Sequence, residues 1–297
     1  MRTAFINQLI EEARKDKKVF LLTGDLGFSV LEPFAEEFPD RFINVGVAEQ
    51  NMAGIAAGLA MDGWNVFMYS IANFPTLRCI EQIRYDICFH NLNVKVVSVG
   101  SGYAYAALGP SHHATEDIGM IRTIPNITVA SPGDPIEAKA ITSEIVKYTG
   151  PCYLRLGKAG EKVVHSDIIK NLKIGNGFEI RKGNDTAILA CGSILKYAND
   201  FLNENSLNYG LYSLPFVKPL DKKMLKEIAL NYKNIITLEE HQKSAGFGSA
   251  ILEGYNDLLE EGKIKSFPKI KRIAIPDIFI NTSGTQDYLR SIAKLKL

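Results

Sequence analysis

The segment from Arg41 to Gly63, RFINVGVAEQNMAGIAAGLAMDG, limits the possible fold of this chain more than any other segment. It begins with the apolar run 42–45, which predicts a short buried strand, and it continues after Gly46 as a helix of unusually small residues. Gly54 and Gly58 lie inside that helix, where each glycine costs about 1 kcal/mol relative to alanine. We therefore expect another helix or a ligand to pack very close to the helix backbone.

A single carboxylate, Glu49, lies in the first turn of this helix. An acidic side chain at that position complements the helix dipole, which by itself is a sufficient structural reason for it. From position alone, stabilisation of the helix end is the simpler interpretation, and a catalytic role needs further support.

Apolar runs that predict strands alternate with amphipathic segments that predict helices along nearly the whole chain. The expected strands are 19–23, 42–45, 65–69, 94–99, 127–130, 152–156, 186–190, 209–213, 235–239 and 270–275. Besides the small-residue helix, the expected helices are 3–15, 31–38, 76–91, 115–122, 134–148, 194–203, 221–230 and 249–259. This alternation predicts parallel sheets covered by helices on both faces.

A polar stretch without an apolar period, residues 158–184, divides this pattern into two series. We interpret it as the connection between two domains, 1–165 and 185–297, with the linker itself at 166–184. A chain of 297 residues is long enough for each of two domains to bury its own core. The predicted fold class is therefore α/β, with two domains.

Charge and cysteine usage argue against several classes of protein. A net charge of +1 gives no electrostatic footprint for nucleic acid or for a membrane surface, and no apolar stretch approaches the length of a membrane span. The cysteines form no CxxC pair and predict buried, reduced thiols rather than disulfides or a zinc site. They are Cys79, Cys88, Cys152 and Cys191. A cytoplasmic protein is expected.

The sequence VGVAEQNMAGIAAGLA, residues 45–60, resembles the segment of thiamine-diphosphate enzymes that carries their single essential glutamate. The similarity is greatest to the pyrimidine-binding and C-terminal domains of transketolase, and it extends over residues 2–290. The resemblance implies a pyrimidine-binding domain followed by a transketolase C-terminal-like domain. It also implies that Glu49 is catalytic and holds the aminopyrimidine ring of the cofactor in an apolar place, where a hydrogen bond to the ring is strong.

Three further residues match positions near the cofactor in this family. Phe74, in YSIANFPTLR, matches an aromatic residue of the pyrimidine wall, although an ordinary core position is the alternative. Ile71 stands where the family has another aromatic residue. Asp25 follows the first strand, at the edge where doubly wound sheets bind ligands, although turn chemistry alone accounts for it. Arg78, close to Phe74, is a candidate for a subunit interface.

The segment GPSHHATED, residues 109–117, resembles the family's Gly-Pro-Thr-His segment, and His112 takes the place of its histidine. The resemblance implies that His112 contacts oxygen atoms of the substrate. Arg155, Arg2 and Ser29 match positions that bind the sugar phosphate, for which a guanidinium offers paired donors in one plane. Adjacent histidines on a loop diverge, and no further ligand is spaced for a metal ion, so no metal ion is assigned to this chain's side chains.

The expected C-terminal domain contains the run Glu239-Glu240-His241 and a glycine turn, 246–248, before a helix. A glycine turn at a helix N-terminus can bind an anion, but two glycines are a weak signal. We interpret these features as structural, because in this family the C-terminal domain mainly supports dimer contacts.

Two positions depart from the transketolase pattern. Leu108 stands where the family has an aspartate that binds a sugar hydroxyl, and Gly100 stands where it has a further histidine. The loop between them, SGYAYAAL, is unusually apolar. We expect a deoxygenated or branched sugar phosphate as substrate rather than the ordinary pentose phosphates.

Thiamine-diphosphate enzymes bind the diphosphate through Mg²⁺ on a Gly-Asp-Gly segment, and this chain contains no such segment. The resemblance therefore implies a separate subunit with the diphosphate-binding domain, and an α₂β₂ heterotetramer in which this chain is the second subunit. The expected activity is ketol transfer between phosphorylated sugars, with thiamine diphosphate and Mg²⁺, and only with that partner. One alternative is the beta subunit of a 2-oxo acid dehydrogenase. Another is a scaffold subunit without catalytic activity, against which the presence of Glu49 and His112 argues.

Overall fold

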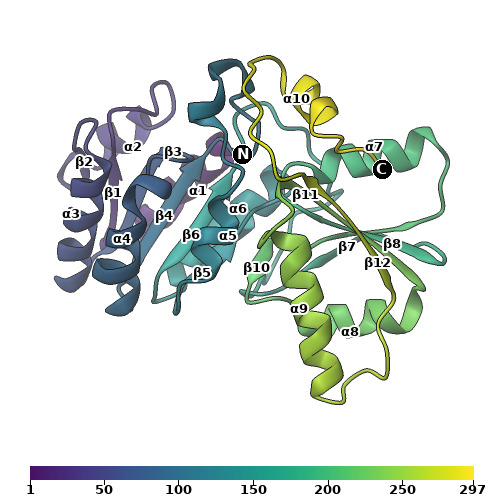
Figure 1. Cartoon of the computed structure of the whole chain (residues 1–297). Coiled ribbons are helices and arrows are strands. Elements are labelled where there is room, and N and C mark those ends of the chain that lie inside the picture. Colours follow the sequence, from purple (N-terminus) through teal and green to yellow (C-terminus); the bar gives the residue numbers. More distant parts are fainter.

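The computed structural model describes residues 1–297, which form two α/β domains that lie side by side (Figure 1). The two-domain α/β class predicted from the sequence is confirmed. None of the helices is both long and apolar enough to cross a membrane.

The first domain is built on a seven-stranded sheet with the strand order β10-β5-β6-β4-β3-β1-β2. Its strands are β1 (Val19–Thr23), β2 (Phe42–Asn44), β3 (Asn65–Ile71), β4 (Val94–Val99), β5 (Thr128–Ala130), β6 (Cys152–Leu156) and β10 (Phe216–Lys218). Strands β1 to β6 pair in parallel, and β10 pairs antiparallel with β5. The inner strands are buried on both faces and therefore consist of near-continuous apolar runs, which made them recognisable in the sequence.

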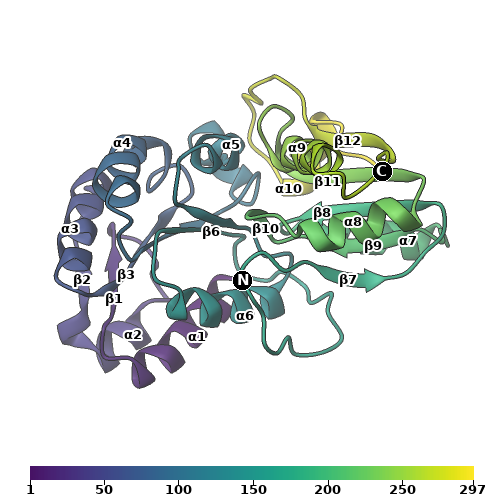
Figure 2. The same ribbon diagram turned by 90° about the horizontal axis from the view of Figure 1, so that it is seen from below.

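Helices cover both faces of this sheet (Figure 2). On one face lie α1 (Arg2–Lys15) and α6 (Pro135–Lys147), whose apolar side chains share a core with β1, β3 and β4. On the other face lie α3 (Glu49–Met61), the helical segment 77–89 and α5 (Asp117–Arg122), which belong to a second core. The short helix α2 (Glu32–Glu37) follows the loop after β1. The small residues of α3 bring its backbone close to the sheet, because Met52, Ala53 and Ala56 are fully buried there.

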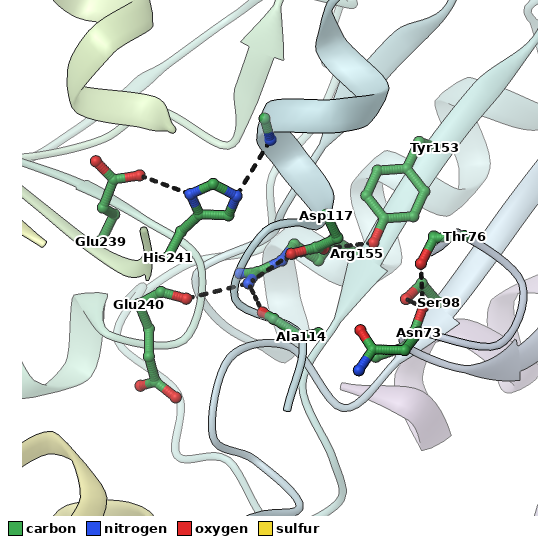
Figure 3. A network of polar contacts seen from close by, with 12 residues as sticks. Asn73, Thr76, Ser98, Ala114, Asp117, Tyr153, Arg155, Glu239, Glu240 and His241 are labelled. Atoms are coloured by element: carbon green, nitrogen blue, oxygen red, sulfur yellow. Dashed lines mark hydrogen bonds and ion pairs between the residues drawn. The ribbon is translucent and has the colours of Figure 1, made fainter. Parts of the chain in front are cut away.

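The second domain has a five-stranded sheet with the order β12-β11-β8-β9-β7. Its strands are β7 (Phe178–Arg181), β8 (Thr186–Cys191), β9 (Gly210–Ser213), β11 (Asn234–Gln242) and β12 (Lys269–Ile275). Its helices are α7 (Leu195–Glu204), α8 (Lys222–Asn231), α9 (Phe247–Glu260) and α10 (Gln286–Ile292). The carboxyl end of β11 points toward the first domain, so Glu239, Glu240 and His241 lie at the contact between the domains (Figure 3).

Two short strands of the structure are not predicted from the sequence. β7 lies within the expected linker, 166–184, and pairs with β9 of the second sheet. β10 follows β9 of the second sheet but returns to the edge of the first sheet. Both pair antiparallel at a sheet edge and have only four and three residues, which is too short for an apolar period to stand out.

The segment 41–63 departs from the prediction in two respects. The expectation of a buried strand at 42–45 is wrong, because β2 is the edge strand of the sheet and Ile43 is 40% exposed. In addition, no other part of the chain lies within 4 Å of a Cβ added at Gly54 or Gly58. The close neighbour that these glycines predict is therefore absent from the chain itself.

The predicted helix at 76–91 is irregular. It begins with a 3₁₀ turn at Leu77–Cys79, passes through α4 (Ile80–Gln82) and ends as a π-helix at Ile83–Phe89. π-helical turns are rare in proteins, and those that occur often lie near functional sites. The start of this segment holds Arg78 and follows directly after Phe74.

Candidate active site

The predicted site residues gather where the parallel strands of the first sheet end. Asp25 follows β1, Phe74 follows β3, and Glu49 begins the helix after β2. His112 lies in the long loop between β4 and α5. Because the carboxyl ends of parallel strands meet at one edge of a sheet, this edge is the usual place for a ligand site in such folds.

Glu49 is a deeply buried charged group at this edge, with 2% of its surface exposed. Its Oε2 atom accepts a hydrogen bond from Arg78 Nη1 at 2.7 Å, which is its only ion pair. The other oxygen, Oε1, has no hydrogen-bond partner in the chain and faces Gly24, where an added Cβ would lie 3.5 Å away. Gly24 therefore adds no side chain against this buried carboxylate.

Arg78 and Phe74 connect Glu49 with His112. The Arg78 guanidinium lies over the Phe74 ring, with 4.8 Å between its central carbon and the ring centroid. The Phe74 ring in turn meets the His112 ring edge to face, at 5.4 Å between centroids. The Arg78 side chain is 45% exposed, so its charged head reaches solvent while pairing with Glu49. The structure thus brings together three predicted residues and places Arg78, predicted only as an interface candidate, in the same group.

The His112 side chain is half-buried at the end of a short 3₁₀ turn, Pro110–His112. Its Nδ1 atom lies 3.0 Å from the Ser111 hydroxyl oxygen. The neighbouring His113 points the other way, is buried, and packs edge to face against Tyr103 at 5.1 Å between centroids. Burial lowers the pKa of His113, which favours its neutral form. The two histidines therefore diverge as the sequence indicated.

Asn73 is a member of this group that sequence reasoning missed. Its side-chain amide donates hydrogen bonds to the carbonyl oxygens of Ser111, at 3.3 Å, and of His113. It thereby ties the end of β3 to the turn that carries His112. Its position next to Phe74 in the sequence is the only signal that pointed to it.

Asp25 and Ser29 lie in an exposed turn after β1, and both adopt a positive φ, of 57° and 60°. The Asp25 carboxylate accepts a hydrogen bond from the Asn44 side chain at 3.0 Å, and the Asn44 oxygen accepts one from the Asp25 backbone N–H at the same distance. The Ser29 backbone N–H donates to Glu32 Oε1 at 2.7 Å, which leaves the hydroxyl group free. Ile71, the last residue of β3, is half-buried.

Arg155, which is predicted to bind a substrate phosphate, is held by partners within the chain. Arg155 is buried in β6, and its Nε atom donates to Asp117 Oδ2 at 2.7 Å. Its Nη2 atom donates to the Ala114 carbonyl oxygen at 2.6 Å and to the Glu240 carbonyl oxygen at 3.1 Å (Figure 3). Although burial opposes it, the charge of Arg155 holds the pKa of Asp117 below its ordinary value. The Nη1 atom has no hydrogen-bond partner in the chain, and binding of a substrate phosphate by Arg155 stays a prediction.

Arg2 begins α1 and is half-buried beside the Tyr105 side chain. Burial raises the pKa of the Tyr105 hydroxyl, and the nearby Arg2 partly offsets that effect. The Arg2 Nε atom is buried and has no hydrogen-bond partner.

The two departures from the transketolase pattern lie in the loop after β4. Gly100 has a φ of 102°, and a Cβ added there would lie 2.5 Å from Tyr105 Cε2 and closer still to Cδ2. Tyr105 thus occupies the space that a histidine at position 100 would need. Leu108 ends a 3₁₀ turn and is 55% exposed, so an apolar surface stands where a carboxylate was expected from the resemblance.

The glycine turn before α9 offers no free anion site. Both oxygens of Glu239 accept hydrogen bonds from backbone N–H groups of the first helical turn, at 2.6 Å from Phe247 and 2.8 Å from Gly248. The carboxylate of the same domain therefore already caps this helix, because an acidic group satisfies the free N–H groups of a helix start and complements its dipole. The structural interpretation of this segment is confirmed. Throughout residues 1–297, no three His, Cys, Asp or Glu side chains are arranged to hold a metal ion.

Comparisons with known families cover nearly the whole chain. Residues 1–160 match the family described as transketolase, pyrimidine binding domain. Residues 175–294 match the family described as transketolase, C-terminal domain. The first of these matches alone covers more than half of the 297 residues.

Individual relatives show the same relationship. An apulose-4-phosphate transketolase subunit of Phocaeicola vulgatus is 33% identical over 280 residues, which are 93% of this chain and 87% of that protein. The 1-deoxy-D-xylulose-5-phosphate synthase of Shouchella clausii is 34% identical over 301 residues, or 98% of this chain but only 46% of that protein. A solved structure described as a split gene transketolase, inactive beta4 tetramer, has a TM-score of 0.85 and 32% identity, covering 99% of this chain and 93% of that one.

Proposed function

This chain belongs to the transketolase family, and we propose that it is the subunit of a split transketolase that carries the pyrimidine-binding half of a thiamine-diphosphate site. The observation that carries this proposal is the buried carboxylate of Glu49 at the start of α3, whose Oε1 atom has no hydrogen-bond partner in the chain. A buried charge is costly unless it is paired. Arg78 pairs with Oε2 of Glu49, so Oε1 is left for a ligand to bind.

The residues around Glu49 fit the flat ring of the cofactor. Bound thiamine diphosphate supplies a nucleophilic carbon that breaks and re-forms a carbon–carbon bond beside a carbonyl group. In this proposal Glu49 holds the pyrimidine ring nitrogen and shares a proton with it, while Phe74 and Ile71 form the wall of the ring site. Asp25 lies at the same edge and contributes polar contacts. Because Arg78 now pairs with the Glu49 carboxylate, its guanidinium shares or yields that position when the ring binds.

The proposed reaction is ketol transfer between phosphorylated sugars. His112, which is joined to the Glu49 group through Phe74, contacts oxygen atoms of the sugar. Arg155, Arg2 and Ser29 are the residues proposed to bind its phosphate. The apulose-4-phosphate transketolase name of one relative supports an unusual, branched sugar. So do the exposed Leu108 and the Tyr105 ring that excludes a side chain at position 100.

We further propose that the diphosphate and Mg²⁺ are held by a separate subunit, in an α₂β₂ assembly. The chain has no Gly-Asp-Gly segment, and relatives of matching length are described as one subunit of a transketolase and as a split gene product. The uncovered glycines of α3 are consistent with a neighbouring chain that packs against this helix.

The test is ketol transfer by this chain mixed with a candidate diphosphate-binding subunit, thiamine diphosphate and Mg²⁺. Glu49→Gln keeps the side-chain shape but removes the shared proton, so activity should fall by about 10²-fold or more, the range of general acid–base effects. Glu81→Gln, at an exposed carboxylate that pairs with Arg84, is the matched control and should keep full activity. Near-normal turnover by Glu49→Gln would overturn the assignment. Activity on 2-oxo acids alone, with a lipoyl acceptor, would instead identify a 2-oxo acid dehydrogenase subunit.

A further inference from the structure

The loop that carries His112 is held at both ends by the second domain. We define the His112 loop as residues 102–119, which connect the region after β4 to the first turn of α5. Glu240, His241 and Gln242, all at the carboxyl end of β11, hydrogen-bond to it, and the Gly284 backbone N–H donates to the Ala106 carbonyl oxygen at 3.3 Å.

The first end of the loop is fixed by the Glu240 carboxylate. Its Oε1 atom accepts a hydrogen bond from the Tyr103 backbone N–H at 2.5 Å. Gly102, just before it, has a φ of 58°, and a Cβ added there would lie only 2.5 Å from the same oxygen. Since only a glycine leaves room for this approach, the carboxylate and the loop backbone fit each other closely.

The other end of the loop is fixed by the two residues that follow Glu240. His241 Nε2 accepts a hydrogen bond from the Gly119 backbone N–H at 3.1 Å, and burial lowers the pKa of His241, which keeps that nitrogen free to accept. The Gln242 backbone N–H donates to the Thr115 carbonyl oxygen at 2.7 Å. Gly119 is again a glycine facing the second domain, where an added Cβ would lie 3.1 Å from the Ala245 Cβ.

Arg155 adds a further contact between the second end of the loop and β11. Its Nη2 atom donates to Ala114 in the loop and to the Glu240 carbonyl oxygen in the second domain, while Nε binds Asp117 (Figure 3). All of these groups are buried. Arg155, which the sequence predicts to bind substrate, therefore connects the His112 loop to β11.

The Glu240 carboxylate is itself held by α10. Arg290 Nε donates to Oε2 at 2.5 Å, and Gln286 Nε2 donates to Oε1 at 2.9 Å. Glu240 is 4% exposed, so a water molecule has little access to replace either donor. The position of the carboxylate is thus set by the last helix of the chain.

We propose that Glu240 is a positioning residue, through which the second domain holds the His112 loop in the geometry needed for sugar binding and transfer. This inference rests on the proposed function and adds a role for the C-terminal domain beyond subunit contacts. Between its two anchors the loop contains short 3₁₀ turns and one β-bridge, between Gly102 and Ala114, and contacts from outside the loop complete its fixed shape. A misplacement of about 1 Å at a catalytic group lowers turnover by about 10²-fold.

The test compares Glu240→Gln with Glu253→Gln. Glutamine keeps the size of Glu240 but loses the charge that pairs with Arg290. Glu253 also forms an ion pair across the domains, with Arg122 at 2.5 Å, but it does not touch the His112 loop, so it is the matched control. In the complex with its partner subunit, Glu240→Gln should lower kcat by about 10-fold to 100-fold. The dissociation constant of thiamine diphosphate should stay unchanged, because Glu240 does not contact Glu49, Arg78 or Phe74.

A second readout needs no partner subunit and no activity. The chain has five histidines, so ¹³C-labelled histidine gives a simple NMR spectrum. The His112 signal should shift or broaden in Glu240→Gln and stay in place in Glu253→Gln, while the exposed His90 serves as internal reference. If Glu240→Gln does not fold, Gln286→Leu removes one donor to the same carboxylate and should produce a smaller change of the same kind.

An unchanged His112 signal together with a kcat equal to that of Glu253→Gln would overturn the inference. A loss of thermal stability without either change would assign Glu240 a merely structural role and would also overturn it. If the wild-type complex lacks ketol transfer altogether, the proposed function fails, and the NMR comparison still decides whether Glu240 positions the loop.

Discussion

Replacing Arg78 by methionine should destabilise the isolated chain, because it leaves the Glu49 carboxylate without its only ion pair. Methionine keeps much of the apolar stem that lies over Phe74 but removes the guanidinium. The Glu49 side chain is 1% exposed and lies 2.7 Å from Arg78. Removing one partner of a fully buried pair costs about 3–5 kcal/mol.

The exposure of Arg78 reduces that figure. Its side chain is 45% exposed, so water reaches the pair from one side and screens the charges. We therefore expect Arg78→Met to lower the free energy of unfolding by about 1–3 kcal/mol, between the values for exposed and buried pairs. Urea denaturation near pH 7.5 measures this directly, since the midpoint shifts while the slope stays constant if only stability has changed.

Two further variants isolate the interaction. Arg84→Met removes an exposed ion pair with Glu81 and should change stability by less than about 0.5 kcal/mol. In the double variant Arg78→Met/Glu49→Gln, the amide needs no counter-ion, so the cycle should yield a coupling energy of about 1 kcal/mol or more. A loss in Arg78→Met no larger than that in Arg84→Met, with no coupling to Glu49, would refute the view that Glu49 is a buried carboxylate dependent on Arg78.

Two other predictions concern stability in the first domain. Burial raises the pKa of Glu137, which faces His165, to about 7. Because the folded chain then binds a proton that the unfolded chain has lost, the free energy of unfolding should fall by about 1–3 kcal/mol from pH 5 to pH 8. Glu137→Gln should flatten that pH dependence in urea titrations, and an unchanged dependence would contradict the prediction. Gly100→Ala should lower the free energy of unfolding by about 1–3 kcal/mol, the usual cost of overpacking, because the added methyl group meets the Tyr105 ring. Adding Tyr105→Ala to the same chain should recover part of the loss. If the effects of the two substitutions simply add, the contact between them is refuted.

The sequence predicted the central strands and the fold class because burial on both faces requires continuous apolar runs. The inner strands β1, β3 and β4 lie close to their expected limits. The edges of the sheets were harder to predict. β2 is half-exposed, and β7 and β10 are too short to show a period, so their places depend on tertiary contacts that no local pattern records.

For the site, the sequence indicated which loops carry chemistry better than it indicated what each side chain does. Glu49, Phe74 and His112 were brought together as expected. Arg78 was noticed, but its pairing with Glu49 was not, because the two lie in different elements. An arginine at the end of a buried strand fits a phosphate ligand and a buried carboxylate equally well. Only the fold shows that Asp117 lies 2.7 Å from Arg155.

The central claim is that this chain provides one half of a thiamine-diphosphate site. The most direct test is calorimetric binding of thiamine diphosphate with Mg²⁺, to this chain alone and to its mixture with a subunit that carries the Gly-Asp-Gly segment. We expect thiamine diphosphate to bind tightly only to the mixture, and we expect that binding or the subsequent activity to be lost when Glu49 is replaced. Equally tight binding by this chain alone would contradict the divided site.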